Sequence, residues 1–255
     1  HLAGHVGGIG LNREKPGELF YDNLIMGTQL LHESKLAGIQ KFVALGTICS
    51  YPKFTQIPFL EENIWNGYPE ETNAPYGLAK KMLLVQSKAY REQYNFKSIV
   101  VIPTNLYGPE DNFDPSSSHV IPALILKIFQ AKKNNINKIE VWGDGTPTRD
   151  FLFVDDAAQG IVDAAKYYDE DSPLNLGSSE EISIKYLVDH IAKILNYDGK
   201  IIWNTSKPNG QPRRCVSYNQ AKEKINFQPK TSLFEGLEQT INWFVTSQKQ
   251  SSLNI

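Results

Sequence analysis

The first part of the chain alternates between segments with helical spacing of apolar residues and short, continuous apolar runs. Residues 17–37 carry apolar side chains at helical spacing, and Gly38 stands where a glycine commonly ends a helix. Residues 41–45 form an apolar run, and a second helical pattern over residues 73–94 precedes a second run over residues 98–103. This alternation of helix and buried strand predicts an α/β fold built on a parallel sheet.

The pattern is less regular in the second part of the chain. Residues 108–118 are rich in Asp, Pro and Ser, which predicts a long loop. We therefore expect a main domain portion in residues 1–110 and a smaller α/β lobe mainly in residues 111–255, with some segments returning to the main domain. The elements predicted there are a helix over residues 119–133 capped by Ser118, a strand over residues 139–142, a helix capped by Asp155 or Asp156, and helices that begin at Ser183 and Ser232.

Composition narrows the class of protein. Of the 255 residues, 41% are hydrophobic and 21% charged, as in an ordinary globular domain, and the net charge of -2 does not favour nucleic acid or an anionic membrane as a partner. No apolar run approaches the ~20 residues that span a bilayer, and no signal peptide is evident. Because the only two cysteines, Cys49 and Cys215, do not make a disulfide framework, we expect a reducing, cytoplasmic setting.

Polar residues follow two of the predicted strands. Thr47 and Cys49 come after the run that ends at Leu45, and Thr104 and Asn105 come after Pro103. In an open parallel sheet, ligands bind beyond the carboxyl ends of the strands. We therefore expect both groups to line the same crevice.

Tyr76 and Lys80 lie four residues apart in a predicted helix, and therefore on one face of it. An ammonium group beside a phenol favours the phenolate, so we expect Lys80 to lower the pKa of Tyr76 from its reference value near ~10. Tyr76 could then exchange a proton at neutral pH. Such a pair alone is common on solvated helix faces. The hydroxyl residue Thr47 at the end of the preceding strand is the feature that favours a catalytic role for the pair.

The order of a strand, Thr47, and a helix with Tyr76 and Lys80 resembles the catalytic triad of the short-chain dehydrogenase superfamily. The resemblance implies a Rossmann-like, doubly wound parallel sheet. It also implies that Thr47 hydrogen-bonds the substrate oxygen, that Tyr76 exchanges the proton, and that Lys80 tunes Tyr76 and holds the nicotinamide ribose. The run Leu-Tyr-Gly-Pro at residues 106–109 is similar to that of extended members which act on nucleotide sugars.

Longer strings resemble the GDP-L-fucose synthase family over nearly the whole chain. That family epimerises carbons 3 and 5 of GDP-4-keto-6-deoxy-D-mannose and reduces carbon 4 with NADPH. By resemblance, Cys49 and His119 are the base and acid of the epimerisation, and their reference pKa values near ~8.5 and ~6.5 suit proton exchange at neutral pH. The strings are residues 5–9, 45–53, 103–113, 118–124, 141–151 and 206–214.

The same resemblance implies where the ligands bind, with NADP(H) as the cofactor, a GDP-sugar as the substrate and no metal. A purely structural reading stays open for four positions, namely Cys49 as a small buried side chain, His119 as a polar helix start, Trp142 as core, and Arg214 as part of a solvated pair with Arg213. The implied cofactor-binding residues are Thr47, Tyr76, Lys80, Pro103, Thr104, Asn105, Leu106 and His119. The implied substrate-binding residues are Lys127, Trp142, Arg149, Asn209 and Arg214.

The chain departs from the family pattern at Thr47, where Ser is usual, and at Lys127, where Arg is usual. It also lacks a Gly-rich turn after a first strand, which would bind the dinucleotide pyrophosphate. Because the chain begins at His1, we expect that the first strands of the sheet, on the order of ~60 residues, are missing.

Two alternatives to a GDP-L-fucose synthase remain open. One is another NAD(P)-dependent nucleotide-sugar epimerase, and the other is a truncated sugar-nucleotide-binding fragment with impaired catalysis. Dehydration is disfavoured, because sugar-nucleotide dehydratases carry an Asp-Glu pair where this chain has Ile48 and Cys49. By resemblance we also expect a homodimer that forms through the helices of residues 17–37 and 73–94.

Overall fold

The computed structural model describes residues 1–178, 180–207 and 209–253, and its first sheet is parallel throughout. Strands β1 (Phe42–Leu45), β2 (Ser98–Pro103) and β6 (Leu174–Leu176) are arranged in the order β1-β2-β6. All residues of β2 are buried, because this strand lies in the middle of the sheet. A continuous apolar run is the sequence signature of such a strand.

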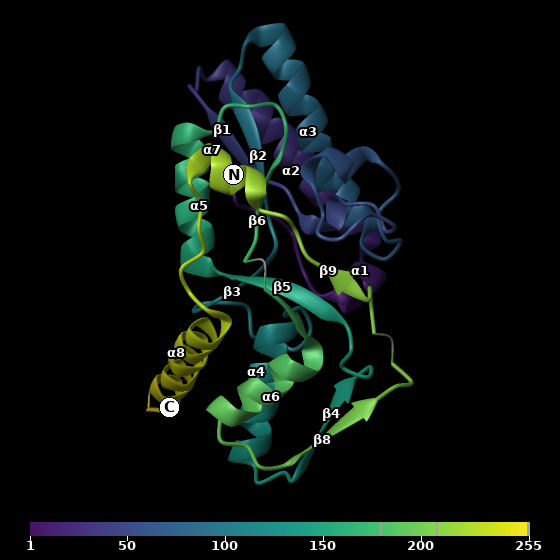
Figure 1. Ribbon diagram of the computed structural model, residues 1–255, viewed down its shortest axis with the longest axis vertical. Helices are drawn as coiled ribbons and strands as arrows, with labels where there is room; N and C mark the ends of the chain where they lie inside the picture. The colour runs from purple at the N-terminus through teal and green to yellow at the C-terminus, as the bar shows by residue number, and fades with distance from the viewer. Residues whose placement is uncertain (179, 208, 254–255) are drawn as a thin grey trace.

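Helices cover both faces of this sheet (Figure 1). Val100 and Ile102 of β2 pack in one core with α2 and α3. Ile99 and Val101, which point to the opposite face, pack in another core with α5 and α7. The doubly wound α/β sheet that we expected is therefore confirmed. The helices are α2 (Pro16–Leu36), α3 (Ala74–Tyr94), α5 (Val154–Tyr167) and α7 (Asn219–Ile225).

Later segments form a second lobe, which lies in the lower part of Figure 1. Its helices pack around a core that includes Ile125, Leu187 and Phe244, beside the parallel pair β4-β8. A sheet of order β3-β5-β7, with β9 also paired to β5, lies between the lobe and the first sheet. The elements are α4 (Val120–Lys133), α6 (Ile184–Ile194), α8 (Leu233–Leu253), β3 (Asn105–Tyr107), β4 (Lys138–Trp142), β5 (Thr148–Phe153), β7 (Glu181–Ser183), β8 (Lys200–Asn204) and β9 (Arg213–Arg214).

Two of the predicted helix caps are confirmed by their hydrogen bonds. Ser183 accepts a hydrogen bond from the backbone N–H of Tyr186 at 3.1 Å. Ser232 accepts one from the N–H of Glu235, whose carboxylate accepts in return from the N–H of Ser232 at 3.1 Å. This reciprocal pair is a capping box, which satisfies backbone donors that the first turn of a helix leaves free.

Two other predicted caps are wrong. The residue at the N-cap of α4 is His119, and the buried hydroxyl of Ser118 has no hydrogen-bond partner among the described residues. Asp155 and Asp156 lie inside the first turn of α5, since β5 runs directly into this helix and Phe153 is at its N-cap. The carboxylate of Asp156 instead accepts from the N–H of Thr231.

No helix in the ranges that the structure describes is both long and apolar enough to cross a membrane.

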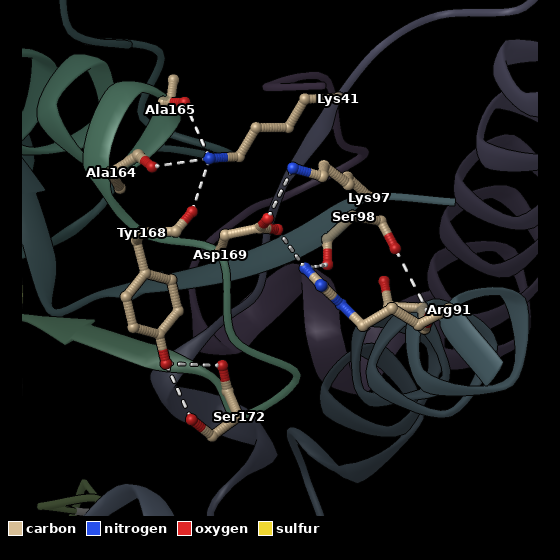
Figure 2. A network of polar contacts seen from close by, with 10 residues as sticks. Lys41, Arg91, Lys97, Ser98, Ala164, Ala165, Tyr168, Asp169 and Ser172 are labelled. Carbon is tan, nitrogen blue, oxygen red and sulfur yellow. Dashed lines mark hydrogen bonds and ion pairs between the residues drawn. The ribbon is translucent and has the colours of Figure 1, made fainter. Parts of the chain in front are cut away.

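The end of the first sheet opposite the predicted site is held by a lysine that binds a helix C-terminus (Figure 2). The Lys41 ammonium donates to the carbonyls of Ala165 at 2.8 Å and Tyr168 at 2.5 Å, and more weakly to that of Ala164. The last carbonyls of a helix have no partner within the helix and carry partial negative charge, so a cation there is stabilising. Nearby, Asp169 pairs with both Arg91 and Lys97.

We expect Lys41→Met to lower the free energy of unfolding by about 1–3 kcal/mol, because it removes charge-assisted hydrogen bonds to carbonyls that are partly buried. Urea unfolding followed by circular dichroism measures this change. The matched control is Lys97→Met, which removes an ion pair from a side chain that is 57% exposed and should cost no more than about 1 kcal/mol. Equal losses in the two variants would contradict the capping role of Lys41.

Candidate active site

The turn that follows β1 is held close to α3. Thr47 accepts a hydrogen bond through its hydroxyl from the N–H of Cys49 at 3.2 Å, which stabilises a short 3-10 turn. Ser50 donates to the carbonyl of Gly77 at 2.8 Å. A Cβ atom at Gly77 would lie 2.3 Å from the carbonyl oxygen of Cys49, so only glycine permits this approach. Gly77 therefore brings the neighbouring Tyr76 against the turn that carries Thr47 and Cys49.

Tyr76 is enclosed beside these two residues. Burial is the main reason that its pKa lies above the ordinary value, and the negative charge of the Cys49 thiolate adds to the increase. A hydrogen bond with Thr47 acts in the opposite direction. The structure thus joins Thr47 and Tyr76 as the sequence predicted, but the protonated phenol is the favoured form.

Lys80 does not lower the pKa of Tyr76, contrary to our expectation. The lysine is only 3% exposed, and its ammonium donates to the carbonyl of Ala3 at 3.1 Å. Burial lowers the pKa of Lys80 as well. An ammonium has three donor hydrogens, and a single backbone acceptor leaves donors that suit the hydroxyls of a ribose. Lys80 therefore fits the nicotinamide ribose better than it fits the role of a direct partner to the phenol.

Cys49 faces guanidinium groups that come from distant parts of the chain. Arg214 of β9 lies with Nη1 3.5 Å from the Cys49 sulfur, and its Nε donates to Gln211. Arg149 of β5 is paired in register with Arg214. Burial, followed by the charge of Arg214, lowers the pKa of Arg149 to about 10, while the charges of Cys49 and Glu181 act to raise it. The sulfur of Cys49 thus lies beside a guanidinium group.

Arg213 and Arg214 are not equivalent. Arg213 is 54% exposed and forms a bidentate pair with Glu181, with Nη2 2.5 Å from its carboxylate oxygen. Arg214 is partly buried against Cys49. The reading as a solvated pair is therefore right for Arg213 and wrong for Arg214.

The residues after β2 support β5. Thr104 and Asn105 both donate to the backbone carbonyl of Asp150, at 3.0 and 2.8 Å. Pro103 ends β2, and Leu106 packs in the core on the α5 side. The polar side chains of Thr104 and Asn105 thus hold the strand that carries Arg149. Contacts between these four residues and a cofactor stay a prediction.

The remaining substrate candidates gather around the end of β4. Trp142 is 54% exposed, which excludes the core reading, and the ammonium of Lys207 lies 5.4 Å from the centre of its ring. Lys127 donates to the carbonyl of Glu140, two residues before Trp142. The side-chain oxygen of Asn209 accepts from the N–H of Asp144 at 2.9 Å.

This outer group is continuous with the inner one. A Cβ atom at Gly210, next to Asn209, would lie 3.4 Å from Nη2 of Arg149. The segment that carries Asn209 therefore lies next to Arg149, and substrate binding by these residues stays a prediction. The described residues contain no cluster of three His, Cys, Asp or Glu side chains that could hold a metal ion.

His119 lies apart from this cluster. Its side chain is exposed at the N-cap of α4, and its charge lowers the pKa of Asp111, which burial otherwise raises. Within the part of the chain that the structure describes, no hydrogen bond joins His119 to Cys49. The reading as a polar helix start is compatible with this position, and a role in proton transfer stays a prediction.

Sequence reasoning missed Asp150, Gln211 and Gly77. Asp150 carries the only local signal, since a carboxylate directly before the apolar run Phe-Leu-Phe of a strand predicts a buried partner. Gly77 acts through a close backbone approach, and Gln211 through a hydrogen bond to Arg214 three residues away, and neither leaves a periodic pattern.

A hydroxyl, a tyrosine and a lysine at the carboxyl edge of a doubly wound sheet, next to a second α/β lobe, define the class of extended short-chain dehydrogenases and reductases. The family profile described as "NAD dependent epimerase/dehydratase family" matches residues 1–177. The GDP-L-fucose synthase of Sinorhizobium fredii is 41% identical over 96% of this chain and 78% of its own length, and that of Escherichia coli is 35% identical over 96% and 79%.

Solved structures agree with these relatives. A GDP-L-fucose synthetase from Naegleria fowleri superposes with a TM-score of 0.89 at 30% identity and covers 98% of this chain, which spans 77% of that chain. The same protein bound to NADP superposes with a TM-score of 0.88. The chain belongs to the GDP-L-fucose synthase family.

Proposed function

We propose that this protein converts GDP-4-keto-6-deoxy-D-mannose to GDP-L-fucose, by epimerisation at carbons 3 and 5 and reduction at carbon 4. The observation that carries the proposal is the half-buried thiol of Cys49, which faces Arg214 and lies next to Thr47 and Tyr76. A thiol is the proton-transfer group that an epimerase needs here, and no carboxylate pair for dehydration stands in its place.

The 4-keto group acidifies the protons on carbons 3 and 5, so each centre can be inverted by removal and return of a proton. Cys49 and His119 exchange these protons, and Arg214 contacts the Cys49 sulfur at 3.5 Å. NADPH, when bound, supplies the hydride for carbon 4. Tyr76 then donates its proton to the carbon 4 oxygen, which Thr47 also hydrogen-bonds. The raised pKa of Tyr76 keeps that proton on the phenol until the oxygen becomes strongly basic.

The surface around Trp142 is the proposed nucleotide site. Its exposed ring offers a face for the base, and Lys127 and Asn209 lie on the same surface. Arg149 provides a guanidinium fork suited to the diphosphate, between this surface and the thiol. We assign to Arg214 the contact with Cys49, and not a role in nucleotide binding.

We also propose a homodimer that forms through α2 and α3, and a location in the cytoplasm. The two helices pack side by side, and their outer faces expose large apolar side chains. A groove of about 510 Å³ between them is lined by Thr28, Gln29, His32, Glu33, Gln86 and Tyr90.

Turnover in D2O tests the proposed function. The full-length protein, given GDP-4-keto-6-deoxy-D-mannose and NADPH, should oxidise NADPH and yield GDP-L-fucose with deuterium at carbons 3 and 5, as read by NMR. Reduction without deuterium at these carbons would indicate a simple 4-reductase. Deuterium exchange or epimerisation without NADPH consumption would indicate another nucleotide-sugar epimerase. If the protein catalyses neither deuterium exchange nor reduction, the proposal is wrong.

A further inference from the structure

Asp150 is a fully buried carboxylate one residue after Arg149. One of its oxygens accepts from both the N–H and the hydroxyl of Ser178, at 3.0 and 2.6 Å. Its carboxylate also accepts from the N–H of Val216 and interacts with the hydroxyl of Thr104. Asp150 thus joins β5 to three other segments of the chain.

The segment that follows β9 depends on this carboxylate. β9 comprises only Arg213 and Arg214, so it has few hydrogen bonds of its own. Cys215, the next residue, has its sulfur 3.9 Å from the second oxygen of Asp150. Its backbone carbonyl accepts from the N–H of Phe59, which fixes the other side of the segment. Glu181 binds Arg213 on one side of Arg214, and Asp150 is the side-chain anchor on the other side, at Cys215.

The packing around the anchor leaves little freedom. A Cβ atom at Gly177 would lie 2.6 Å from the second oxygen of Asp150 and 2.6 Å from a methyl group of Val216. Burial raises the pKa of Asp150 to about 6, and it raises that of Cys215 to about 12 with a contribution from the charge of Asp150. Cys215 is consequently a protonated donor next to the carboxylate, which suits a structural contact.

We propose that Asp150 is a positioning residue that holds the segment after β9, so that the guanidinium of Arg214 meets the thiol of Cys49. The inference rests on the proposed function only in giving Cys49 a role in proton transfer. The geometry itself concerns the free protein: Asp150 binds Val216 and Cys215, these fix the end of β9, and β9 carries the group that contacts the sulfur.

Alkylation of Cys49 by iodoacetamide as a function of pH tests this coupling without turnover. Only the thiolate reacts, so the pH of half-maximal rate reports how strongly the neighbouring charges of Arg214 and Arg149 favour it. Peptide mapping by mass spectrometry separates Cys49 from the unreactive Cys215. In Arg214→Met of the full-length protein, we expect the midpoint to rise by about one pH unit.

Asp150→Asn is the informative variant. An amide presents a donor on one side, so it cannot accept from both Ser178 and Val216. We expect the midpoint for Cys49 to move in the same direction as in Arg214→Met, and the double variant to behave like Arg214→Met alone, because both changes act on one contact. The matched control is Asp156→Asn, a buried aspartate in the first turn of α5, which should leave the midpoint unchanged.

An unchanged midpoint in Asp150→Asn, or a shift that adds to that of Arg214→Met, would overturn the proposal. If circular dichroism reports that Asp150→Asn is unfolded, Ser178→Ala takes its place, since it removes one donor and keeps the charge. A smaller shift in the same direction is then expected, and no shift would overturn the proposal. If the midpoint for Cys49 does not depend on Asp150 while the protein forms GDP-L-fucose, only this inference fails. If the midpoint depends on Asp150 but no GDP-L-fucose is formed, only the proposed function fails.

Discussion

Tyr76→Phe is expected to slow the reduction at carbon 4 by about 10²–10⁴-fold, because it removes the proton donor and leaves the ring in place. The phenol is enclosed beside Thr47 and Cys49, with its pKa raised by burial, so it is protonated at neutral pH. Single-turnover oxidation of NADPH measures the effect directly. Deuterium exchange at carbons 3 and 5 should be affected much less, since it does not require this proton.

Tyr107→Phe is the matched control for that experiment. Tyr107 is buried in the second lobe, and its hydroxyl donates to the carbonyl of Leu233 at 3.4 Å, far along the chain from the thiol. Its loss should change stability more than the rate of reduction. Comparable losses of rate in the two variants would remove the case for Tyr76 as the proton donor.

Cys49→Ser is expected to slow epimerisation by about 10²–10⁴-fold, because a serine hydroxyl is a far weaker acid than a cysteine thiol and exchanges protons less readily. The measurement is the initial rate of deuterium incorporation at carbons 3 and 5 in D2O, with NADPH omitted so that reduction does not compete. The variant should still bind GDP, because the nucleotide surface around Trp142 and Arg149 is unchanged.

Cys215→Ser serves as the comparison for Cys49→Ser. Burial raises the pKa of Cys215 to about 12, so this thiol has no base function at neutral pH. We expect a far smaller loss of exchange than in Cys49→Ser. If Cys49→Ser retained the exchange rate, proton transfer at carbons 3 and 5 would have to be assigned to other residues, and the reading as a GDP-L-fucose synthase would weaken.

Elements with a strong periodic pattern were predictable from the sequence. The strand over residues 98–103 matches β2 residue for residue, and the helix over residues 73–94 differs from α3 only at its first residue. Both follow from burial, which requires continuous apolar runs in a central strand and apolar spacing in a packed helix. The strands β3, β5, β6, β7, β8 and β9 were not predicted; four of them, β3, β6, β7 and β9, have only two or three residues, which carry too little pattern.

Much of the site also lies in local sequence. Thr47 and Cys49 follow a strand, and Tyr76 precedes the glycine that lets α3 approach them, so their meeting depends on neighbouring elements. The side chain of Lys80 was placed correctly on the helix, but the direction of its ammonium depends on Ala3, 77 positions away. That long-range acceptor is the reason the predicted effect on Tyr76 was wrong.

The sequence alone determined the class of fold and the strand ends that carry the candidate residues, and it predicted which side chains react. These depend on periodicity and on short local motifs. Only the tertiary structure decided which charges meet the thiol. Arg214 lies 165 positions from Cys49, and Asp150 anchors its strand from a third segment. Such contacts come from strand pairing and burial across the chain, so no local pattern encodes them.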